Sequence, residues 1–370
     1  MSRKHSAVKS LTSSTDGIIE PEKKIRNPFL YKFITNWLIT DPDIINDDSS
    51  KKKYNYQVQN HKDMKFLYLF GGRWHLIKQS PVNLGTLIII LIPGILYFIF
   101  ESKWIWHNIT PGLVILQTYF WLMSLLFFFK ASTSDPGQLP RNIHLPLLPN
   151  RQTHSINNPP QEYFNTIKLP YYKDNQIGVT IRYCPTCHIW RPPRTSHCST
   201  CNICIKIHDH HCGFLNNCIG HRNYQYFLWL LLSGNIACIL LIIQSIVHVL
   251  HYRMVEHSTI TSFHASISKY PIAFLLVLWG LLSLEFPLAL MLLHIYLTAQ
   301  NITTREFLNY VVGKHQPGFV NVYDTKSILN NLFINWISKP RGNLVVRPMD
   351  PYNKDDIRYQ HIEPLQTFDH

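Results

Sequence analysis

Four long apolar segments alternate with polar, charged segments along this chain of 370 residues. Each approaches the roughly 20 residues that an α-helix needs to cross the hydrocarbon core of a bilayer. Helices buried in the core of a soluble domain rarely extend this far with so few charges. The pattern therefore predicts four transmembrane helices, at residues 81–100, 111–129, 226–250 and 271–297.

The basic residues indicate how these spans are oriented. The chain has 35 Lys and Arg against 22 Asp and Glu, a formal net charge of +13. All but Lys103, Arg253 and Lys269 fall in the two tails or between the second and third spans. By the positive-inside rule, both termini and that loop are expected in the cytosol. The basic residues are spread along the polar parts, which favours anionic headgroups or a phosphate-bearing ligand over nucleic acid.

The expected fold class is therefore an α-helical integral membrane protein. It has four transmembrane helices and a cytosolic, zinc-binding cysteine-rich domain between the second and third. We divide the chain into a partly disordered N-terminal region (1–80), helices 1 and 2 (81–129), a linker (130–183), the cysteine-rich domain (184–225), helices 3 and 4 (226–297) and a C-terminal region (298–370).

The zinc prediction rests on cysteine spacing. Seven of the eight cysteines lie between Cys184 and Cys218. A disulfide framework is not expected, because cytosolic thiols stay reduced. Two Cys-x-x-Cys pairs, at 184/187 and 198/201, with histidines nearby are instead typical of zinc sites, which take four tetrahedral nitrogen or sulfur ligands.

A count of ligands separates one cysteine from the others. Two closed sites need eight ligands, and six cysteines with two histidines supply them, which leaves Cys212 over. This residue ends the sequence "DHHC", next to His210, His211 and Asp209. A spare thiol beside an imidazole and a carboxylate is the arrangement of nucleophilic catalysis. The count does not say which histidines bind metal, and Cys212 as a ligand in a differently partitioned cluster stays an alternative.

The segment from Cys184 to Phe227 resembles the cysteine-rich domain of the DHHC protein acyltransferases. Flanking motifs of that family also match: "DPG" at Asp135–Gly137, "TTRE" at Thr303–Glu306 and a fainter element around Asn331. The segments "SDPGQLPRNIHLP", "IWRPPR" and "FGGRW" are closest to the branch of the family that modifies Ras proteins in fungi. The first 60 residues and the C-terminal tail are not covered.

The resemblance implies a role for each matching residue. One zinc ion is expected on Cys184, Cys187, His197 and Cys204, and a second on Cys198, Cys201, His211 and Cys218. Cys212 is then the nucleophile, His210 its general base and Asp209 the partner that orients the base. Further expected roles are contact with Asp209 by Thr304, bracing by Asn331, and acyl-coenzyme A binding by Arg191, Arg194, Arg222 and Phe214. At position 214 the family usually has Trp, so chain-length preference or turnover is expected to differ.

The implied function is a protein-cysteine S-palmitoyltransferase that uses a fatty acyl-coenzyme A through an acyl-Cys212 intermediate. Its expected partners are the membrane, a prenylated Ras-type GTPase substrate and a small accessory regulatory subunit, with no nucleic acid. The expected location is the endoplasmic reticulum membrane, with the Golgi as the alternative. The competing hypothesis is a membrane-tethered zinc-finger binding module without catalysis.

Overall fold

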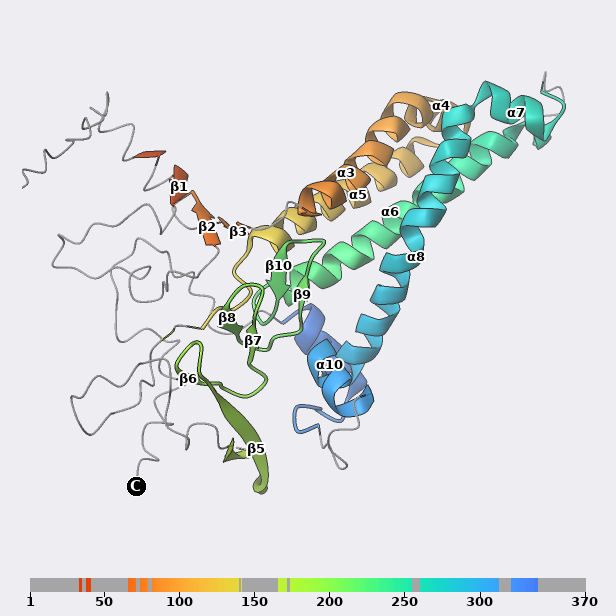
Figure 1. The fold of residues 1–370 in the computed structure, drawn as a ribbon. Coiled ribbons are helices and arrows are strands. Elements are labelled where there is room, and N and C mark those ends of the chain that lie inside the picture. Colours follow the sequence, from red (N-terminus) through yellow and green to blue (C-terminus); the bar gives the residue numbers. More distant parts are fainter. Residues whose placement is uncertain are drawn as a thin grey trace, which may run out of the picture.

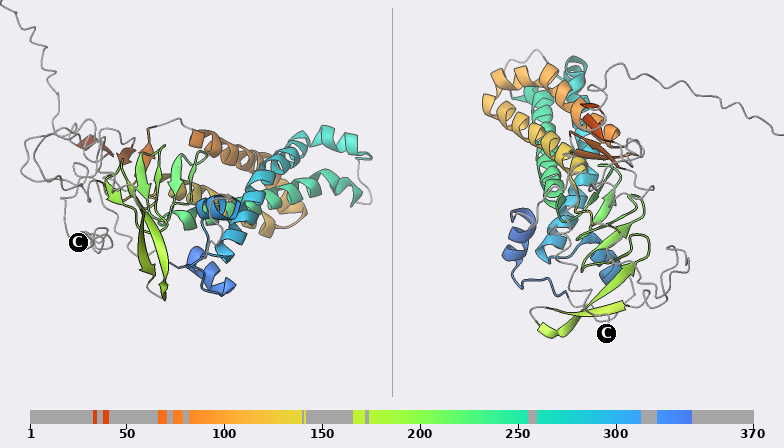
Figure 2. Two further views of the ribbon diagram at one scale, coloured as in Figure 1. Left: turned by 60° about the horizontal axis from the view of Figure 1, so that its bottom comes forward. Right: turned by 90° about the vertical axis from the view of Figure 1, so that its left-hand side faces the viewer.

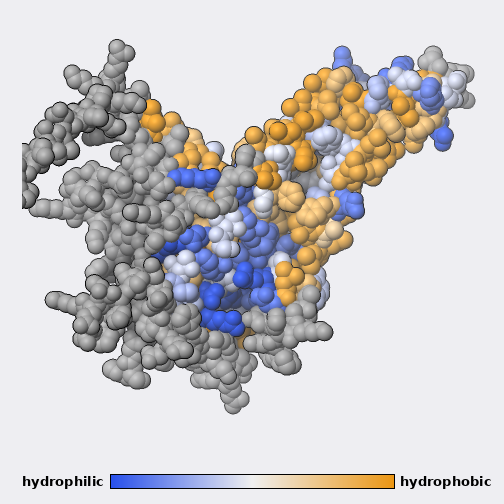
Figure 3. Space-filling model, in the orientation of Figure 1, coloured by the Kyte–Doolittle hydropathy of each residue, from blue (hydrophilic) through white to orange (hydrophobic). Residues whose placement is uncertain are grey.

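The computed structural model describes residues 33–34, 38–40, 66–70, 74–78, 82–139, 141, 166–171, 174–254, 260–312 and 321–338. Four helical segments in it are long and apolar enough to cross a membrane, so the four predicted spans are confirmed. They run over Val82–Asn108, Pro111–Thr133, Tyr224–Arg253 and Pro271–Ala299. Apolar residues cover the face of these helices seen in Figure 3, as contact with lipid requires.

The first span is longer than the apolar pattern indicated. It consists of α3 (Val82–Leu96), a π-helical turn η2 (Tyr97–Glu101) and α4 (Ser102–Asn108). The pattern ended at residue 100 because Glu101 is charged. That carboxylate is buried and lies 2.7 Å from Nδ1 of His248. A buried pair of this kind lets the helix continue past the charge.

The remaining α-helices are α5 (Pro111–Thr133), α6 (Tyr224–Leu250), α7 (Phe263–Lys269), α8 (Pro271–Ala299), the short α9 (Thr304–Glu306) and α10 (Ile328–Trp336). A 3-10 turn, η4 (His251–Arg253), extends α6, and a π-helical segment, η5 (Phe307–Val312), follows α9. The start of α6 and the ends of α5 and α8 meet the cysteine-rich domain, whereas α7 lies at the opposite end of the bundle (Figures 1 and 2). The loop between the second and third spans and the segment after the fourth span therefore lie at the same end, as the charge pattern requires.

The cysteine-rich domain is built from short antiparallel strands. β7 (Ser196–Cys198) pairs with β8 (Ile203–Ile205), and β9 (His210–Cys212) pairs with β10 (Asn217–Ile219). A three-stranded sheet precedes them in the chain: β4 (Thr166–Tyr171), β5 (Asp174–Cys184) and β6 (Ile189–Trp190).

A second three-stranded sheet falls in the region that we expected to be partly disordered. It contains β1 (Ile39–Thr40), β2 (Phe66–Leu69) and β3 (Trp74–Ile77). Phe66 and Ile77 are buried against Cys198 and Cys201, so this sheet covers one side of the cysteine-rich domain. Apart from these strands and residues 33–34, 38, 70 and 78, the region 1–80 lies outside the described part of the chain, as do residues 339–370.

Two buried asparagines attach the cysteine-rich domain to the end of α5. Asn217 Nδ2 donates to the carbonyls of Ala131 and Ser134, at 3.0 and 2.9 Å. Asn223 Nδ2 donates to the Ala131 carbonyl at 3.3 Å. The last carbonyls of a helix have no partner within the helix, so these amides satisfy groups that would otherwise be unpaired. The domain is thereby fixed to the membrane helices through hydrogen bonds.

Gly220 lies where two chain segments approach closely. A Cβ atom at this position would lie 2.6 Å from Cγ2 of Ile205 and 2.7 Å from the carbonyl oxygen of Pro136. We expect Gly220→Ala to lower the free energy of unfolding by about 1–3 kcal/mol, because a backbone atom has to move. Thermal unfolding in detergent measures the change. Gly85→Ala is the control, since nothing lies within 4 Å of its added Cβ; equal losses in both variants would contradict the prediction.

Candidate active site and metal sites

The register of the β9–β10 hairpin separates two kinds of side chain. His211 is paired with Cys218, whereas His210 is paired with Ile219 and Cys212 with Asn217. Successive side chains of a strand point to opposite faces, so His210 and Cys212 share one face and His211 points to the other. The hairpin thus directs one histidine toward Cys218 and leaves the other beside the remaining thiol.

The β7–β8 hairpin divides its residues in the same way. His197 is paired with Cys204, and the next residue, Cys198, points to the opposite face. Neighbouring residues therefore contribute to different clusters, which explains why the two predicted ligand sets interleave along the chain.

Both predicted ligand sets are brought together. Within each set the four candidate ligand atoms lie within 4.8 Å of one another: Cys184, Cys187, His197 and Cys204 in the first, and Cys198, Cys201, His211 and Cys218 in the second. Cys212 belongs to neither.

The distances within each set fit a tetrahedral zinc ion. His197 Nδ1 lies 3.6, 3.3 and 3.9 Å from the three sulfurs of its set. His211 Nδ1 lies 3.7, 3.4 and 3.6 Å from the sulfurs of the other. Zinc–sulfur and zinc–nitrogen bonds at a tetrahedral angle put the two ligand atoms about 3.6 Å apart. Each set could therefore hold one metal ion, and three thiols with one imidazole are a donor set that suits zinc.

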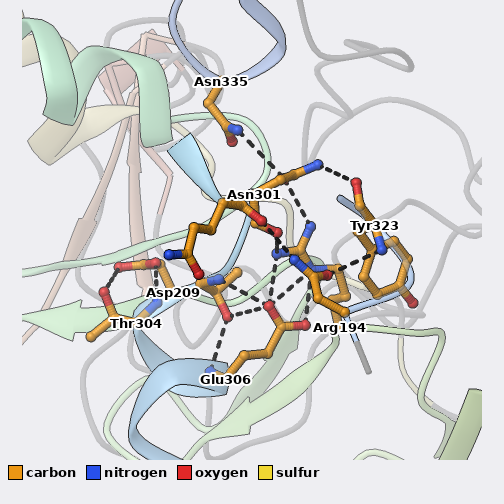
Figure 4. A network of polar contacts seen from close by, with 10 residues as sticks. Arg194, Asp209, Asn301, Thr304, Glu306, Tyr323 and Asn335 are labelled. Atoms are coloured by element: carbon orange, nitrogen blue, oxygen red, sulfur yellow. Dashed lines mark hydrogen bonds and ion pairs between the residues drawn. The ribbon is translucent and has the colours of Figure 1, made fainter. Parts of the chain in front are cut away.

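Asp209 connects His210 to the segment that follows α8. His210 Nδ1 lies 2.6 Å from Oδ2 of Asp209, which is 3% exposed. The backbone N–H of Thr304 donates to Oδ1 and its hydroxyl donates to Oδ2, both at 2.8 Å. Figure 4 shows Thr304 facing Asp209 in this way. The carboxylate thus has fixed partners on both oxygens, and it holds the imidazole in one orientation.

The charges of this pair stabilise each other. Burial is the largest single influence and by itself would raise the pKa of Asp209, but the hydrogen bond and charge of His210 together with the backbone N–H of Thr304 and the nearby His294 lower the pKa to about 2. Burial would also lower the pKa of His210, yet hydrogen bonds with Asp209 and Cys212 raise it to about 9. Between these two values the carboxylate and the imidazolium are both charged. A base of this kind can hold the proton that the neighbouring thiol gives up.

Comparisons with known proteins agree with this geometry. Residues 179–311 match the family model of the DHHC palmitoyltransferases. The palmitoyltransferase ERF2 of Debaryomyces hansenii is 53% identical over 92% of this chain and 93% of its own length. ERF2 of Saccharomyces cerevisiae is 37% identical over 97% of this chain and 96% of its own length. The chain belongs to the DHHC palmitoyltransferase family. It is therefore a protein S-palmitoyltransferase, and the hypothesis of a binding module without catalysis is not supported.

Apolar side chains surround the DHHC thiol. Cys212 is 9% exposed and packs in one cluster with Phe128 of α5 and with Leu228 and Leu231 of α6. Phe214 is 53% exposed, and its ring centroid lies 5.5 Å from that of Phe286 in α8. The sulfur therefore lies at the boundary between the cysteine-rich domain and the apolar helices.

Arg194, a predicted acyl-coenzyme A ligand, has other partners in the structure. Its guanidinium contacts the Glu306 carboxylate at 2.7 Å and donates to the backbone carbonyl of Asn301 at 3.0 Å. Its charge also lies over the ring of Tyr323, 4.6 Å from the centroid. Figure 4 shows these side chains converging on Arg194. Since Glu306 also closes a capping box with Thr303, this network fixes the helical turn that carries Thr304.

The other predicted residues are placed as follows. Arg191 Nε donates to the carbonyl of Arg182 at 3.3 Å, and the Arg222 guanidinium pairs with the carboxylate of Asp135. Asn331 is buried, donates to the Ala299 carbonyl at 2.9 Å, and accepts from the Thr325 backbone N–H at 3.0 Å. Asn331 thus joins the end of α8 to the segment before α10.

Two residues near the site were missed by the sequence analysis. Glu306 belongs to the quoted TTRE motif, but its ion pair with Arg194 joins positions 112 residues apart. His294 lies inside the fourth predicted span, where a single polar residue gave little signal. It is 1% exposed, and its ring centroid lies 6.1 Å from that of His210.

Thr304 provides a test of the Asp209 contacts. Thr304→Val keeps the backbone N–H bond and the branched shape but removes the hydroxyl donor. We expect acyl transfer to slow by about 10–100-fold, because a hydrogen bond to a charged group contributes about 1.5–3 kcal/mol. Initial rates of enzyme acylation measure this effect. Thr304→Ser keeps the donor and should lose little; if it were as slow as Val, the hydroxyl bond would not be the cause.

Proposed function

We propose that this palmitoyltransferase works in two steps, with Cys212 as the residue that carries the acyl group. The observation that supports this most directly is the position of Cys212, outside both metal-ligand sets and beside His210. Asp209 and Thr304 in turn fix the orientation of His210. The metal ions would hold the two hairpins that present these groups, and they would take no part in bond making.

In the first step His210 holds the proton of the Cys212 thiol as an imidazolium, and the Cys212 thiolate attacks the carbonyl carbon of a fatty acyl-coenzyme A thioester. The bond from that carbon to the coenzyme A sulfur breaks, and the leaving thiolate takes the proton from His210. The products are acyl-Cys212 and free coenzyme A. Asp209 stabilises the imidazolium while it holds the proton.

In the second step a cysteine thiol of the protein substrate gives its proton to His210 and attacks acyl-Cys212. The bond between the acyl carbon and the Cys212 sulfur breaks, and the proton passes to Cys212. One thioester is exchanged for another, so the reaction needs no outside energy source. The enzyme returns to its starting state.

The apolar cluster around Cys212 favours a long acyl chain as the donor. Burial of such a chain contributes about 0.8 kcal/mol per methylene group. The fatty chain would lie among the helices, with its thioester at the sulfur. Phe214, exposed and close to Phe286, is placed to contact the chain.

The coenzyme A phosphates need cations, and Arg191 is our first candidate. Its described hydrogen bond uses only Nε, whereas Arg194 and Arg222 each pair with a carboxylate. We expect Arg191→Gln to raise KM for acyl-coenzyme A several-fold with little change in kcat. Arg194→Gln should lower kcat, because it releases the turn that carries Thr304. Rates measured at varied donor concentration separate the two effects; a rise in KM alone for Arg194→Gln would restore its predicted binding role.

The protein substrate that we propose is a prenylated Ras-type GTPase, modified in the endoplasmic reticulum membrane with both termini of the enzyme in the cytosol. A small accessory subunit is proposed to stabilise the enzyme. The resemblance to the Ras-modifying branch of the family and the distribution of basic residues support these proposals.

The test is acylation of a purified prenylated Ras-type protein in vesicles, with and without candidate accessory subunits. We expect acyl transfer to a cysteine of that protein, preceded by labelling of the enzyme that hydroxylamine removes. An enzyme that becomes labelled but does not pass the acyl group to this protein would rule out the substrate and keep the first step. A substrate that is acylated without labelled enzyme would rule out the intermediate.

A further inference from the structure

His294 carries a buried nitrogen atom that no other interaction uses. Its Nδ1 lies 2.9 Å from the hydroxyl of Tyr224, the first residue of α6. Its Nε2 is buried and has no hydrogen-bond partner among the described residues. A buried polar atom without a partner is unfavourable and is often explained by an ion or water molecule that binds there.

The ring of His294 lies next to Asp209 and His210. A carboxylate oxygen of Asp209 and one ring nitrogen from each of His210 and His294 all lie within 4.8 Å of one another. Two imidazoles and a carboxylate are the donor set of three-ligand zinc sites, which leave a fourth position open. Asp209 and His294 are buried, so the ion would be largely removed from solvent.

Two of the three candidate ligands, His294 and Asp209, already have the outer partner that a metal ligand needs. Imidazoles that bind metal usually pass their other ring N–H to an acceptor, which fixes the ring. The Tyr224 hydroxyl is placed to accept from Nδ1 of His294, and this leaves the Nε2 lone pair free for a metal. Thr304 donates to both oxygens of Asp209 in the same way.

We propose that Asp209, His210 and His294 form a third zinc site, and that zinc bound there inhibits the enzyme. The ion would take the place of the proton that Asp209 and His210 share at 2.6 Å, and that proton would leave to solvent. His210 could then no longer accept a proton from a thiol. The inhibition, unlike the metal binding, rests on the proposed role of His210.

The third site has three protein ligands, whereas each of the other two sets has four. Zinc is therefore expected to bind here more weakly and to be removable by a chelator that leaves the first two ions in place. The enzyme would respond to free zinc at concentrations that do not affect its folding.

The experiment uses the full-length protein in detergent, loaded with two zinc ions, and buffered free Zn²⁺ as the probe. Bound metal is counted by mass spectrometry, and enzyme acylation is measured in parallel. We expect a third equivalent to bind, acylation to fall as it binds, and brief chelation to reverse both. A protein that stays at two equivalents and is not inhibited would overturn the proposal.

The variant that tests the ligand set is His294→Asn. Its amide can keep the contact with Tyr224 but does not reach the position of Nε2. We expect affinity for the third zinc ion to fall about tenfold or more, with the inhibition shifting to higher zinc by the same factor. His294→Gln is the second variant, for use if Asn fails to retain two zinc ions. The matched control is His107→Gln, an exposed histidine in α4, which should keep the third equivalent.

Three results separate the possibilities. If His294→Asn slows acylation but leaves the inhibitory zinc concentration unchanged, His294 only positions its neighbours and the proposal is wrong. If Cys212→Ser, which cannot be acylated, still binds a third equivalent that depends on His294, the site stands independently of the reaction. If the third ion binds but acylation continues, the inhibition is wrong, and so is the role of His210 as the base.

Discussion

Cys212→Ser is expected to abolish acylation of the enzyme and to leave its metal content unchanged. The sulfur lies outside both ligand sets, so its loss removes no metal ligand. A serine hydroxyl is a far weaker nucleophile than a thiol, and loss of a nucleophile that acts together with its base costs at least about 1000-fold in rate. Labelling with a fatty acyl-coenzyme A analogue, sensitive to hydroxylamine, measures the first effect, and metal analysis the second.

The outcome of this test distinguishes a nucleophile from a ligand. Release of a metal ion from Cys212→Ser would mean that the thiol holds metal and that the ligand sets are wrongly partitioned. Labelling at the normal rate would mean that another residue carries the acyl group. Only loss of labelling with two retained ions agrees with the proposed mechanism.

Cys201→Ser is expected to lose one metal ion and, as a consequence, its activity, whereas Cys212→Ser should lose activity alone. Cys201 is buried, and its sulfur lies 3.4 Å from both Nδ1 of His211 and the sulfur of Cys218. Structural zinc contributes about 10–16 kcal/mol of apparent binding free energy in small zinc domains. Without this ion the β9–β10 hairpin is no longer held in place, and His210 and Cys212 lose their relative positions.

Metal analysis and limited proteolysis of the cysteine-rich domain measure this effect, in parallel with acylation. Cys238→Ser is the control, because this thiol lies in α6 and belongs to neither ligand set. If Cys201→Ser kept two metal ions, the second site would have a different composition. If it lost one ion but acylated at the normal rate, the metal would not be needed to position Cys212.

The membrane helices could be predicted from the sequence because lipid imposes an apolar composition on every residue that faces it. That rule fails where a polar residue is satisfied inside the bundle, as Glu101 is by His248, and there the predicted span ended too early. His294 was missed for a related reason. Along the sequence it is a single polar residue in a long apolar span, and only the folded chain brings its ring close to that of His210.

The count of metal ligands was also available from the residue spacing, but their partition into two sets came only from the resemblance to the family. Eight ligands and one spare thiol follow from spacing, whereas the choice between His210 and His211 depends on strand pairing. The partners of Arg194 are even further away along the sequence. A basic residue in a loop suggests a free charge, but the Glu306 carboxylate that engages it lies 112 residues further along the sequence, after two membrane helices.

Side chains along β9 alternate between two faces, and this limits how the β9–β10 hairpin can change in evolution. One added or deleted residue within the strand would exchange the two faces. His210 and Cys212 would then both point to the metal-binding side, and His211 would point away from Cys218. Such a protein would lose both its acyl-transfer activity and the structure of its cysteine-rich domain. Natural variation in this segment must therefore preserve which residues of β9 point to each face, and this matters more than the length of the loop.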